Sequence, residues 1–165
     1  MATGASQYRF GDLLALSRAS WIRQIRENVE AAGFPSYRRT DSWVLRLLAA
    51  GPLPIGRLGD SMGVTRQTAR QLADGLVTRG YATFGADPAD ARRTLVRLTP
   101  DGKRYARSVE KAQDDLNKTM RRRVTSEDLI VADRVLRAVF GSREARSRVD
   151  AIVSPPVHIR ARSRR

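Results

Sequence analysis

A run of polar side chains between Thr65 and Gln71 has the chemistry needed to read the edges of nucleic-acid bases. Arginine can donate two hydrogen bonds to guanine O6 and N7, and glutamine can pair in the same two-point manner with adenine N6 and N7. Threonine can bind phosphate, and a helix N-terminus directed at phosphate adds a favourable dipole. We therefore expect duplex DNA as a partner, with the following candidates for base and phosphate contacts: Thr65, Arg66, Gln67, Thr68, Arg70 and Gln71.

The residues around this run predict a helix-turn-helix that presents it. Ile55, Leu58 and Met62 share one face of a short helix, and Gly63 permits the tight turn that follows. A second helix, with Thr65 as its N-cap, carries apolar residues at the spacing of a buried helix face: Ala69, Leu72, Ala73, Leu76 and Val77. Asp74 would repel phosphates, which limits the DNA-facing part to the first two turns. An amphipathic surface helix with merely solvated polar residues is the alternative.

Two short strands are expected next, over residues 81–85 and 94–98. The polar, turn-forming segment 86–93 between them makes the hairpin a candidate wing. Arg92 and Arg93 would project from it toward a neighbouring minor groove, where negative potential favours an inserted arginine. Asp87 and Asp90 can bond local backbone N–H groups and brace these arginines; the alternative is a solvated loop with no contact to DNA.

Long amphipathic helices flank this central lobe. The apolar spacing predicts helices over 9–31, from Pro100 to about Met120, and over 129–140 with Ser126 as a cap; a shorter apolar helix precedes Gly51. A lobe of about 60 residues is too small to cover both flanking stripes, which favours a two-fold homodimer.

The fold class is therefore mainly α: a winged helix-turn-helix with a two-stranded wing, plus N- and C-terminal helices that form a dimerisation domain. We assign an N-terminal helix to 1–38, the DNA-binding lobe to 39–104, the C-terminal dimerisation helices to 105–156, including a short last helix over 142–153, and a flexible basic tail to 157–165.

The charge balance points to a polyanionic partner. The chain has 31 Lys and Arg against 17 Asp and Glu, a net charge of +14, and only four of the excess charges lie in the tail. The excess of arginine over lysine suits phosphate and guanine contacts, but it is equally explained by genome composition. No stretch is long enough to cross a bilayer, and the start does not resemble a secretory signal. A cytoplasmic, nucleoid-associated location is expected.

Enzymatic activity is not expected. His158, the single histidine, lies in the predicted tail, where no packed site can hold it for acid–base chemistry. The adjacent carboxylates at 114–115 and 127–128 belong to helix surfaces or caps. Without cysteine there is no thiol nucleophile, thiol redox sensor or cysteine-based zinc site, and no phosphate-binding loop or His/Cys metal cluster occurs. We expect no cofactor and no metal.

The region from about Trp43 to Arg107 resembles the MarR family of winged-helix transcriptional regulators. The resemblance rests on the helix-turn-helix over 55–80, on an Asp-x-Arg wing signature at Asp90 and Arg92, and on a Leu-Thr-x-x-Gly motif ending at Gly102. Ala91 stands where a basic residue is common, and Gly59 stands where alanine is usual, at a cost of about 1 kcal/mol in helix propensity. The resemblance implies a regulator, most often a repressor, that binds a pseudo-palindromic operator as a homodimer.

The resemblance also implies control by a small aromatic or phenolic ligand held between the dimer helices and the DNA-binding lobe. Trp21, Tyr37, Trp43 and Arg46 are the candidates for such an effector site; the alternative is that both tryptophans are core anchors. Two other functions remain open. A nucleoid-associated or architectural protein with little sequence preference would also use the net charge, and a winged helix can serve as an RNA-binding or protein-binding module.

Overall fold

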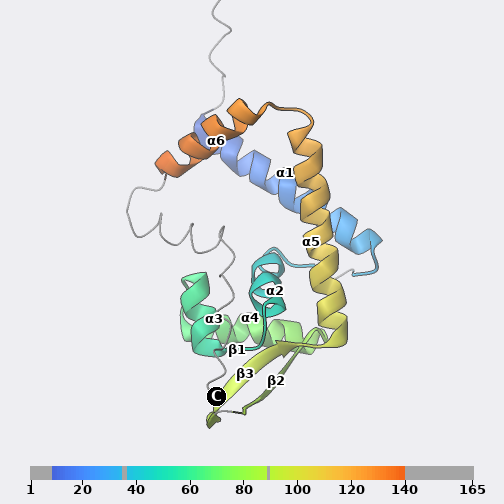
Figure 1. The fold of residues 1–165 in the computed structure, drawn as a ribbon, viewed down its shortest axis with the longest axis vertical. Helices are drawn as coiled ribbons and strands as arrows, with labels where there is room; N and C mark the ends of the chain where they lie inside the picture. Colours follow the sequence, from blue (N-terminus) through green and yellow to red (C-terminus); the bar gives the residue numbers. More distant parts are fainter. Residues whose placement is uncertain (1–8, 35–36, 89, 140–165) are drawn as a thin grey trace, which may run out of the picture.

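The computed structural model describes residues 9–34, 37–88 and 90–139 of the 165-residue chain, with only the backbone of Ala91 and Arg92. Six helices and a small antiparallel sheet alternate along the described part (Figure 1). The helices are α1 (Phe10–Ala31), α2 (Asp41–Ala49), α3 (Ile55–Met62), α4 (Arg66–Thr78), α5 (Pro100–Arg121) and α6 (Ser126–Val139). The strands are β1 (Leu53–Pro54), β2 (Ala82–Asp87) and β3 (Asp90–Leu98).

The helices form two groups joined by α5 (Figure 1). One group comprises α2, α3 and α4, which lie beside the sheet. In the other, α6 and the start of α1 lie at the far end of α5, away from the sheet, and α1 then crosses the middle of α5. This arrangement confirms the predicted fold class, mainly α with a winged helix-turn-helix. Because α5 runs unbroken past residue 104, where a domain boundary was predicted, the proposed domain ranges stay predictions.

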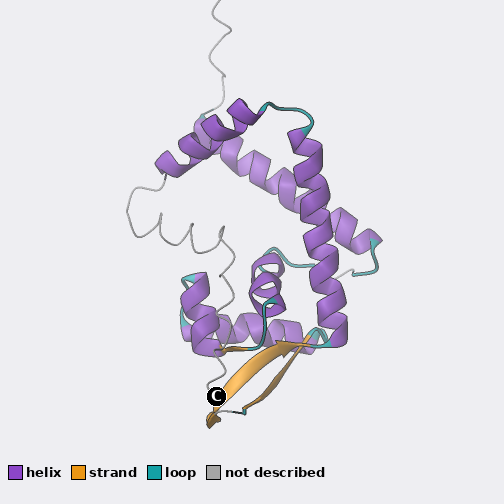
Figure 2. Cartoon of the chain, viewed as in Figure 1, coloured by secondary structure: helices purple, strands orange, loops and turns teal. Residues whose placement is uncertain are grey.

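The sheet differs from the predicted hairpin in two respects. It has three strands, in the order β1-β3-β2, because Leu53 and Pro54 pair with Val96 and Leu95. The hairpin strands are also longer than expected (Figure 2): β2 reaches Asp87, which lies opposite Asp90 at the tip, so most of the predicted loop belongs to the two strands, with a register shift after Ala86. Pro54 was expected only as the residue before a helix. It also closes an edge strand, where its missing N–H is tolerated.

A single core holds the sheet, α4, α2 and α5 together. Its largest fully buried side chains are Tyr105, Leu45, Leu58, Leu76, Val29, Val44 and Val96. The rings of Phe34, Tyr81 and Tyr105 pack on one another, with centroids 4.3 to 6.1 Å apart. Through these rings the end of α1 contacts the same core as the sheet and α5.

The Leu-Thr-x-x-Gly motif explains how α5 leaves the sheet. Thr99 caps the helix, since its Oγ1 accepts a hydrogen bond from the N–H of Gly102 at 3.0 Å and donates one to the carbonyl of Gly80 at 2.7 Å. A Cβ on Gly102 would collide with the carbonyl oxygen of Tyr81. Only glycine therefore allows α5 to pack this closely against the end of α4.

The cap of α6 is a correction to the sequence analysis. Ser126 was expected to cap this helix, but Ser126 is its first residue and Thr125 is the cap. Thr125 accepts from the N–H of Asp128 at 3.1 Å, and the Asp128 carboxylate accepts from the Thr125 N–H at 2.9 Å. The hydrogen bonds that this carboxylate accepts from the N–H and the hydroxyl of Thr125 lower the pKa of Asp128. The helix predicted over 142–153 and the tail over 157–165 lie outside the described residues.

Candidate nucleic-acid interface

Local backbone geometry places α4 as an exposed second helix. Gly63 has φ of 65°, in the left-handed region, and this lets the chain turn sharply after α3. Thr65 then caps α4 as predicted, because its Oγ1 accepts a hydrogen bond from the N–H of Thr68 at 3.1 Å. The two threonine hydroxyls also lie 2.9 Å apart, so each has a partner within α4.

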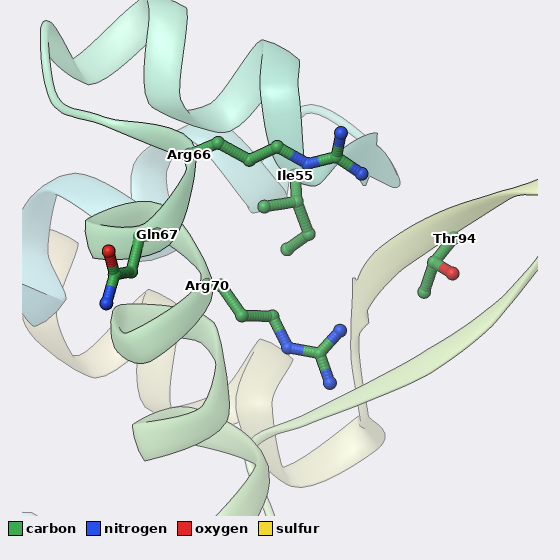
Figure 3. A pocket seen from close by; sticks show the side chains of 5 residues that line it. All are labelled: Ile55, Arg66, Gln67, Arg70 and Thr94. Carbon is green, nitrogen blue, oxygen red and sulfur yellow. The ribbon is translucent and has the colours of Figure 1, made fainter.

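The buried and exposed faces of α4 divide as the apolar spacing indicates. Ala69, Ala73 and Leu76 are completely buried, whereas every predicted DNA-contacting residue on this helix is exposed. Arg66 and Arg70 extend toward the side where Thr94 of β3 lies, and Gln67 extends the other way (Figure 3). A shallow pocket of about 380 Å³ lies between them, with Ile55 at its base. The helix thus presents a cationic edge to the wing and an amide edge to its other side.

Arg70 is held by contacts that the sequence analysis missed. Its Nε donates to both carboxylate oxygens of Asp74, at 3.1 and 3.2 Å. Its guanidinium carbon lies 4.0 Å from the ring centroid of Phe84 on β2, a cation–π contact. The i, i+4 spacing of Arg70 and Asp74 was a local signal for the first contact, but the second depends on how β2 returns beside α4.

The wing contributes a second cationic group. Arg93 is exposed, and its Nε lies 3.5 Å from the Asp90 carboxylate, in keeping with the predicted bracing role of that acid. Arg57 of α3, which was not predicted, joins Arg66 and Arg93 around a groove of about 420 Å³. Arg92 lies in β3, but its side chain is outside the described part of the structure.

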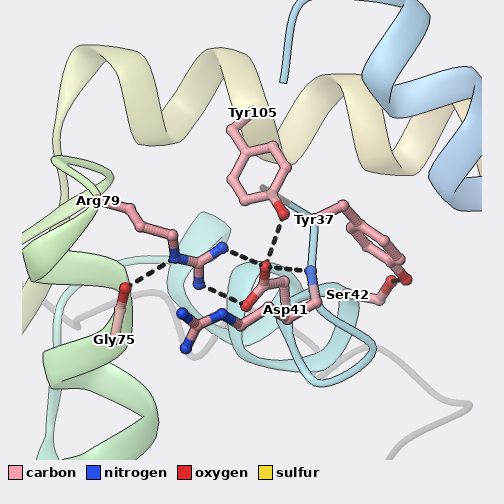
Figure 4. A network of polar contacts seen from close by, with 7 residues as sticks. Tyr37, Asp41, Ser42, Gly75, Arg79 and Tyr105 are labelled. Carbon is pink, nitrogen blue, oxygen red and sulfur yellow. Dashed lines mark hydrogen bonds and ion pairs between the residues drawn. The ribbon is translucent and has the colours of Figure 1, made fainter. Parts of the chain in front are cut away.

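A buried polar network fixes the end of α4 to α2 and α5 (Figure 4). Asp41 is 3 % exposed and accepts hydrogen bonds from both Nη atoms of Arg79, at 2.7 and 2.8 Å. It also accepts from the Tyr105 hydroxyl at 2.6 Å and the Arg38 N–H at 2.9 Å. The sequence analysis did not predict this network, because the Arg79 and Tyr105 partners of Asp41 lie 38 and 64 residues away along the chain.

The network changes the proton affinities of its members. Burial, followed by the hydrogen bond to Asp41, raises the pKa of the Tyr105 hydroxyl. The hydrogen bond to Asp41 raises the pKa of Arg79, so this guanidinium stays charged inside the lobe. Tyr37 lies beside the network, where it shares a 2.7 Å hydrogen bond with Ser42, and burial raises its pKa. The network is therefore a fixed charged brace at ordinary pH.

A larger groove, of about 770 Å³, runs between α2 and α5. Arg46, Lys103 and Arg107 lie along it, together with Glu110 and apolar side chains such as Leu45. Arg46 is one of the four residues predicted for an effector site, and the α5 residues were not predicted. Trp21 and Trp43 are half-buried against the core, and Tyr37 is buried beside Ser42, so their part in an effector site stays a prediction.

Among the residues that the structure describes, no three His, Cys, Asp or Glu side chains group together as a metal site. Within the same residues, no helix has the length and apolar character needed to span a membrane.

About a third of the chain matches a known protein family. Residues 38–93 match the family model described as MarR family, and this match covers the helix-turn-helix and most of the wing. Over these residues the chain is similar to the MarR family. Its fold is MarR-like, with a winged helix-turn-helix between long helices.

Solved structures extend the similarity of this chain to its long helices. The regulator PcaV from Streptomyces coelicolor in complex with its natural ligand is 24% identical, with a TM-score of 0.64, covering 84% of this chain and 96% of that one. A MarR variant from E. coli complexed with operator DNA is 20% identical, with a TM-score of 0.64, covering 78% and 91%. FabT from Streptococcus pneumoniae in complex with DNA is 15% identical, with a TM-score of 0.69, covering 80% and 93%. No match was found among curated protein sequences.

Proposed function

We propose that this protein is a homodimeric repressor that recognises a pseudo-palindromic operator through α4 and the wing. The observation that carries the proposal is the exposed edge of α4, where arginine and glutamine side chains stand beside the cationic wing. Bidentate donors of this kind distinguish base pairs in the major groove, and wing arginines suit the adjacent minor groove. The similar MarR and FabT structures are complexes with DNA, which supports the same partner here.

The uncovered apolar surface of α1 and α6 supports the homodimer. No residue of α6 is buried within the described chain, and Ile130 and Val139 are 69% and 53% exposed. Phe10 and Leu16 on the first half of α1 are 48% and 61% exposed, at the same end of the molecule (Figure 1). A monomer rarely leaves so much contiguous apolar surface in water. A second copy related by two-fold symmetry would cover it and present two α4 helices to one face of DNA.

The groove between α2 and α5 supports an effector site. Arg46, Lys103 and Arg107 supply positive charge, and Leu45, Leu98 and Val109 supply apolar walls. Small aromatic or phenolic acids combine an apolar ring with an anionic group, so they match this lining. Because α2 carries Asp41 and α5 carries Tyr105, a ligand wedged here would act on the network that holds α4.

The net charge of +14 favours one rival function, an architectural protein that binds DNA with little sequence preference. Binding of that kind follows counterion release, with log K falling by about 0.9 per neutralised phosphate for each tenfold rise in salt, whatever the sequence. A regulator instead holds its operator about 10^3-fold or more over random DNA.

Selection from a random duplex pool with the full-length protein tests the proposal, followed by competition binding at two salt concentrations. We expect two related half-sites spaced near 10 base pairs, and an affinity for the selected sequence about 10^3-fold over scrambled DNA. Equal affinity for both duplexes would establish the architectural function instead. Release of the selected duplex by benzoate or a phenolic acid would support the effector site, and Arg46→Ala should abolish that release.

A further inference from the structure

We infer that Asp74 and Phe84 are specificity-determining residues that orient Arg70 to read guanine, an inference that rests on the proposed sequence-specific binding. Asp74 had been regarded as a residue that keeps DNA away from the later turns of α4. Its carboxylate is instead bonded to Arg70, one turn earlier on the exposed face.

The hydrogen-bonding pattern leaves the reading atoms of Arg70 available. Asp74 occupies Nε, and among the described residues Nη1 and Nη2 have no hydrogen-bond partner. These two atoms carry the parallel N–H donors that match O6 and N7 of guanine. A guanidinium bonded through Nε to a carboxylate therefore still presents a two-point donor edge.

Phe84 fixes the plane of that edge. Arg70 lies 4.0 Å over the ring, which belongs to a strand of the wing rather than to α4. Two contacts from different elements restrict the guanidinium, one at its Nε and one at its face. Ordering before binding lowers the side-chain entropy lost when the base contact forms.

Charge argues for a base rather than a phosphate as the target of Arg70. The Asp74 carboxylate cancels most of the net charge of Arg70, so the pair gains little from the diffuse field of the DNA backbone. The directional donors are unaffected by this cancellation. Arg66, one turn earlier, has no ion pair among the described residues, as suits a phosphate contact.

The test compares base preference with total affinity in the full-length protein, by random-pool selection and by binding to duplexes that differ at one selected guanine. Asp74→Ala removes an acid near DNA, so it should raise or maintain affinity for random sequence. The same change should weaken discrimination at the guanine, by a factor that approaches the roughly 5- to 150-fold worth of one bidentate contact. A loss of discrimination at the guanine without a loss of affinity for random sequence indicates an orienting role for Asp74.

Three further variants sharpen the result. Arg70→Lys keeps the charge but loses the fork, and should lose the guanine preference entirely. Phe84→Leu keeps apolar volume but removes the π face, and should weaken the preference less than Asp74→Ala. Asp115→Ala is the matched control, since Asp115 also pairs with a cation four residues away, Lys111, but lies on α5. Asp115→Ala should change neither the affinity for random sequence nor the discrimination at the guanine.

Unchanged guanine discrimination in Asp74→Ala would overturn the inference while leaving the proposed regulator intact. The inference would also be overturned if Arg70→Lys and Arg70→Ala lost affinity uniformly and kept every base preference, and if Arg70→Ala lowered the salt slope by about 0.9. Arg70 would then be a phosphate contact. Failure of the wild-type protein to select any sequence would instead overturn the proposed function itself.

Discussion

Asp41 at the start of α2 binds Arg79 at the end of α4 through both of its carboxylate oxygens. Both side chains are largely excluded from water, at 4% and 12% exposure. The Tyr105 hydroxyl on α5 completes the set, so one carboxylate joins three helices. The C-terminal end of α4 is therefore anchored to α2 and α5 when the exposed first turns of α4 bind a partner.

Removal of the Asp41 carboxylate should strongly destabilise the fold. Asp41→Ala leaves the Arg79 guanidinium charged and buried without its carboxylate partner, at a cost of about 3–5 kcal/mol in the free energy of unfolding. Urea unfolding measures this cost. Arg104→Ala, which breaks an exposed pair with Asp101, is the control and should cost less than about 1 kcal/mol. An equal loss of stability in the two variants would show that the buried pair stabilises the fold no more than the exposed pair does.

Tyr105 should make stability sensitive to alkaline pH. Burial raises its pKa in the folded protein above the ordinary value of about 10, so the unfolded chain loses this proton first as pH rises. The stabilisation that the protonated Tyr105 hydroxyl gives to the folded state is complete below pH 10, and it is lost as the pH rises further toward the folded pKa. Tyr105→Phe should therefore be less stable at pH 7, by about 1–2 kcal/mol, but should show a shallower decline between pH 9.5 and 11. The urea unfolding midpoints of the wild type and Tyr105→Phe across that pH range test this prediction. Parallel declines of the two midpoints would contradict it.

The sequence predicted those parts of the fold that local spacing controls. The buried stripe of α4 and its Thr65 cap depend on residues within one or two turns, and both are confirmed. The contacts that it missed join distant segments: Asp41 with Arg79, Arg70 with Phe84, and Leu53 with Val96. Each depends on how packed elements meet, which no periodicity encodes.

The candidate site divides in the same way. Exposure of the α4 residues follows from amphipathic spacing, so the sequence alone could place them. The α5 lining of the groove could not be predicted from spacing, because Lys103 and Arg107 come beside Arg46 only when α5 packs on α2. The tryptophans attracted attention through their size, and the same size makes them good core residues.

A charge on α6 should separate the proposed dimer. Ile130→Glu places a carboxylate in the exposed apolar face, where a partner copy would bury it without a counter-charge. Sedimentation should then show monomers, and affinity for a two-half-site operator should fall roughly a hundredfold as the avidity of paired binding is lost. Thr119→Glu on the exposed side of α5 is the control. A dimeric Ile130→Glu protein would place the interface elsewhere.

Loss of a wing arginine should affect binding without affecting assembly. Arg92→Ala should weaken operator affinity by about 1 kcal/mol or more, mainly for duplexes with A·T-rich flanks, where the narrow minor groove attracts arginine. Fluorescence anisotropy with A·T-rich and G·C-rich flanks measures the difference. Arg23→Ala removes the same charge from an exposed pair on α1 and should leave binding unaltered. Identical affinities for wild type and Arg92→Ala would exclude this side chain from the interface.

The unbroken length of α5 sets a geometric tolerance for any partner that spans two copies. Its 22 residues measure about 33 Å from the sheet to the end beside α6. A rotation of about 5° at that upper end moves the lower end by roughly 3 Å, close to the 3.4 Å rise between successive base pairs. A rod of this length thus magnifies a slight change of angle between protomers into a mismatch of one full step along the double helix.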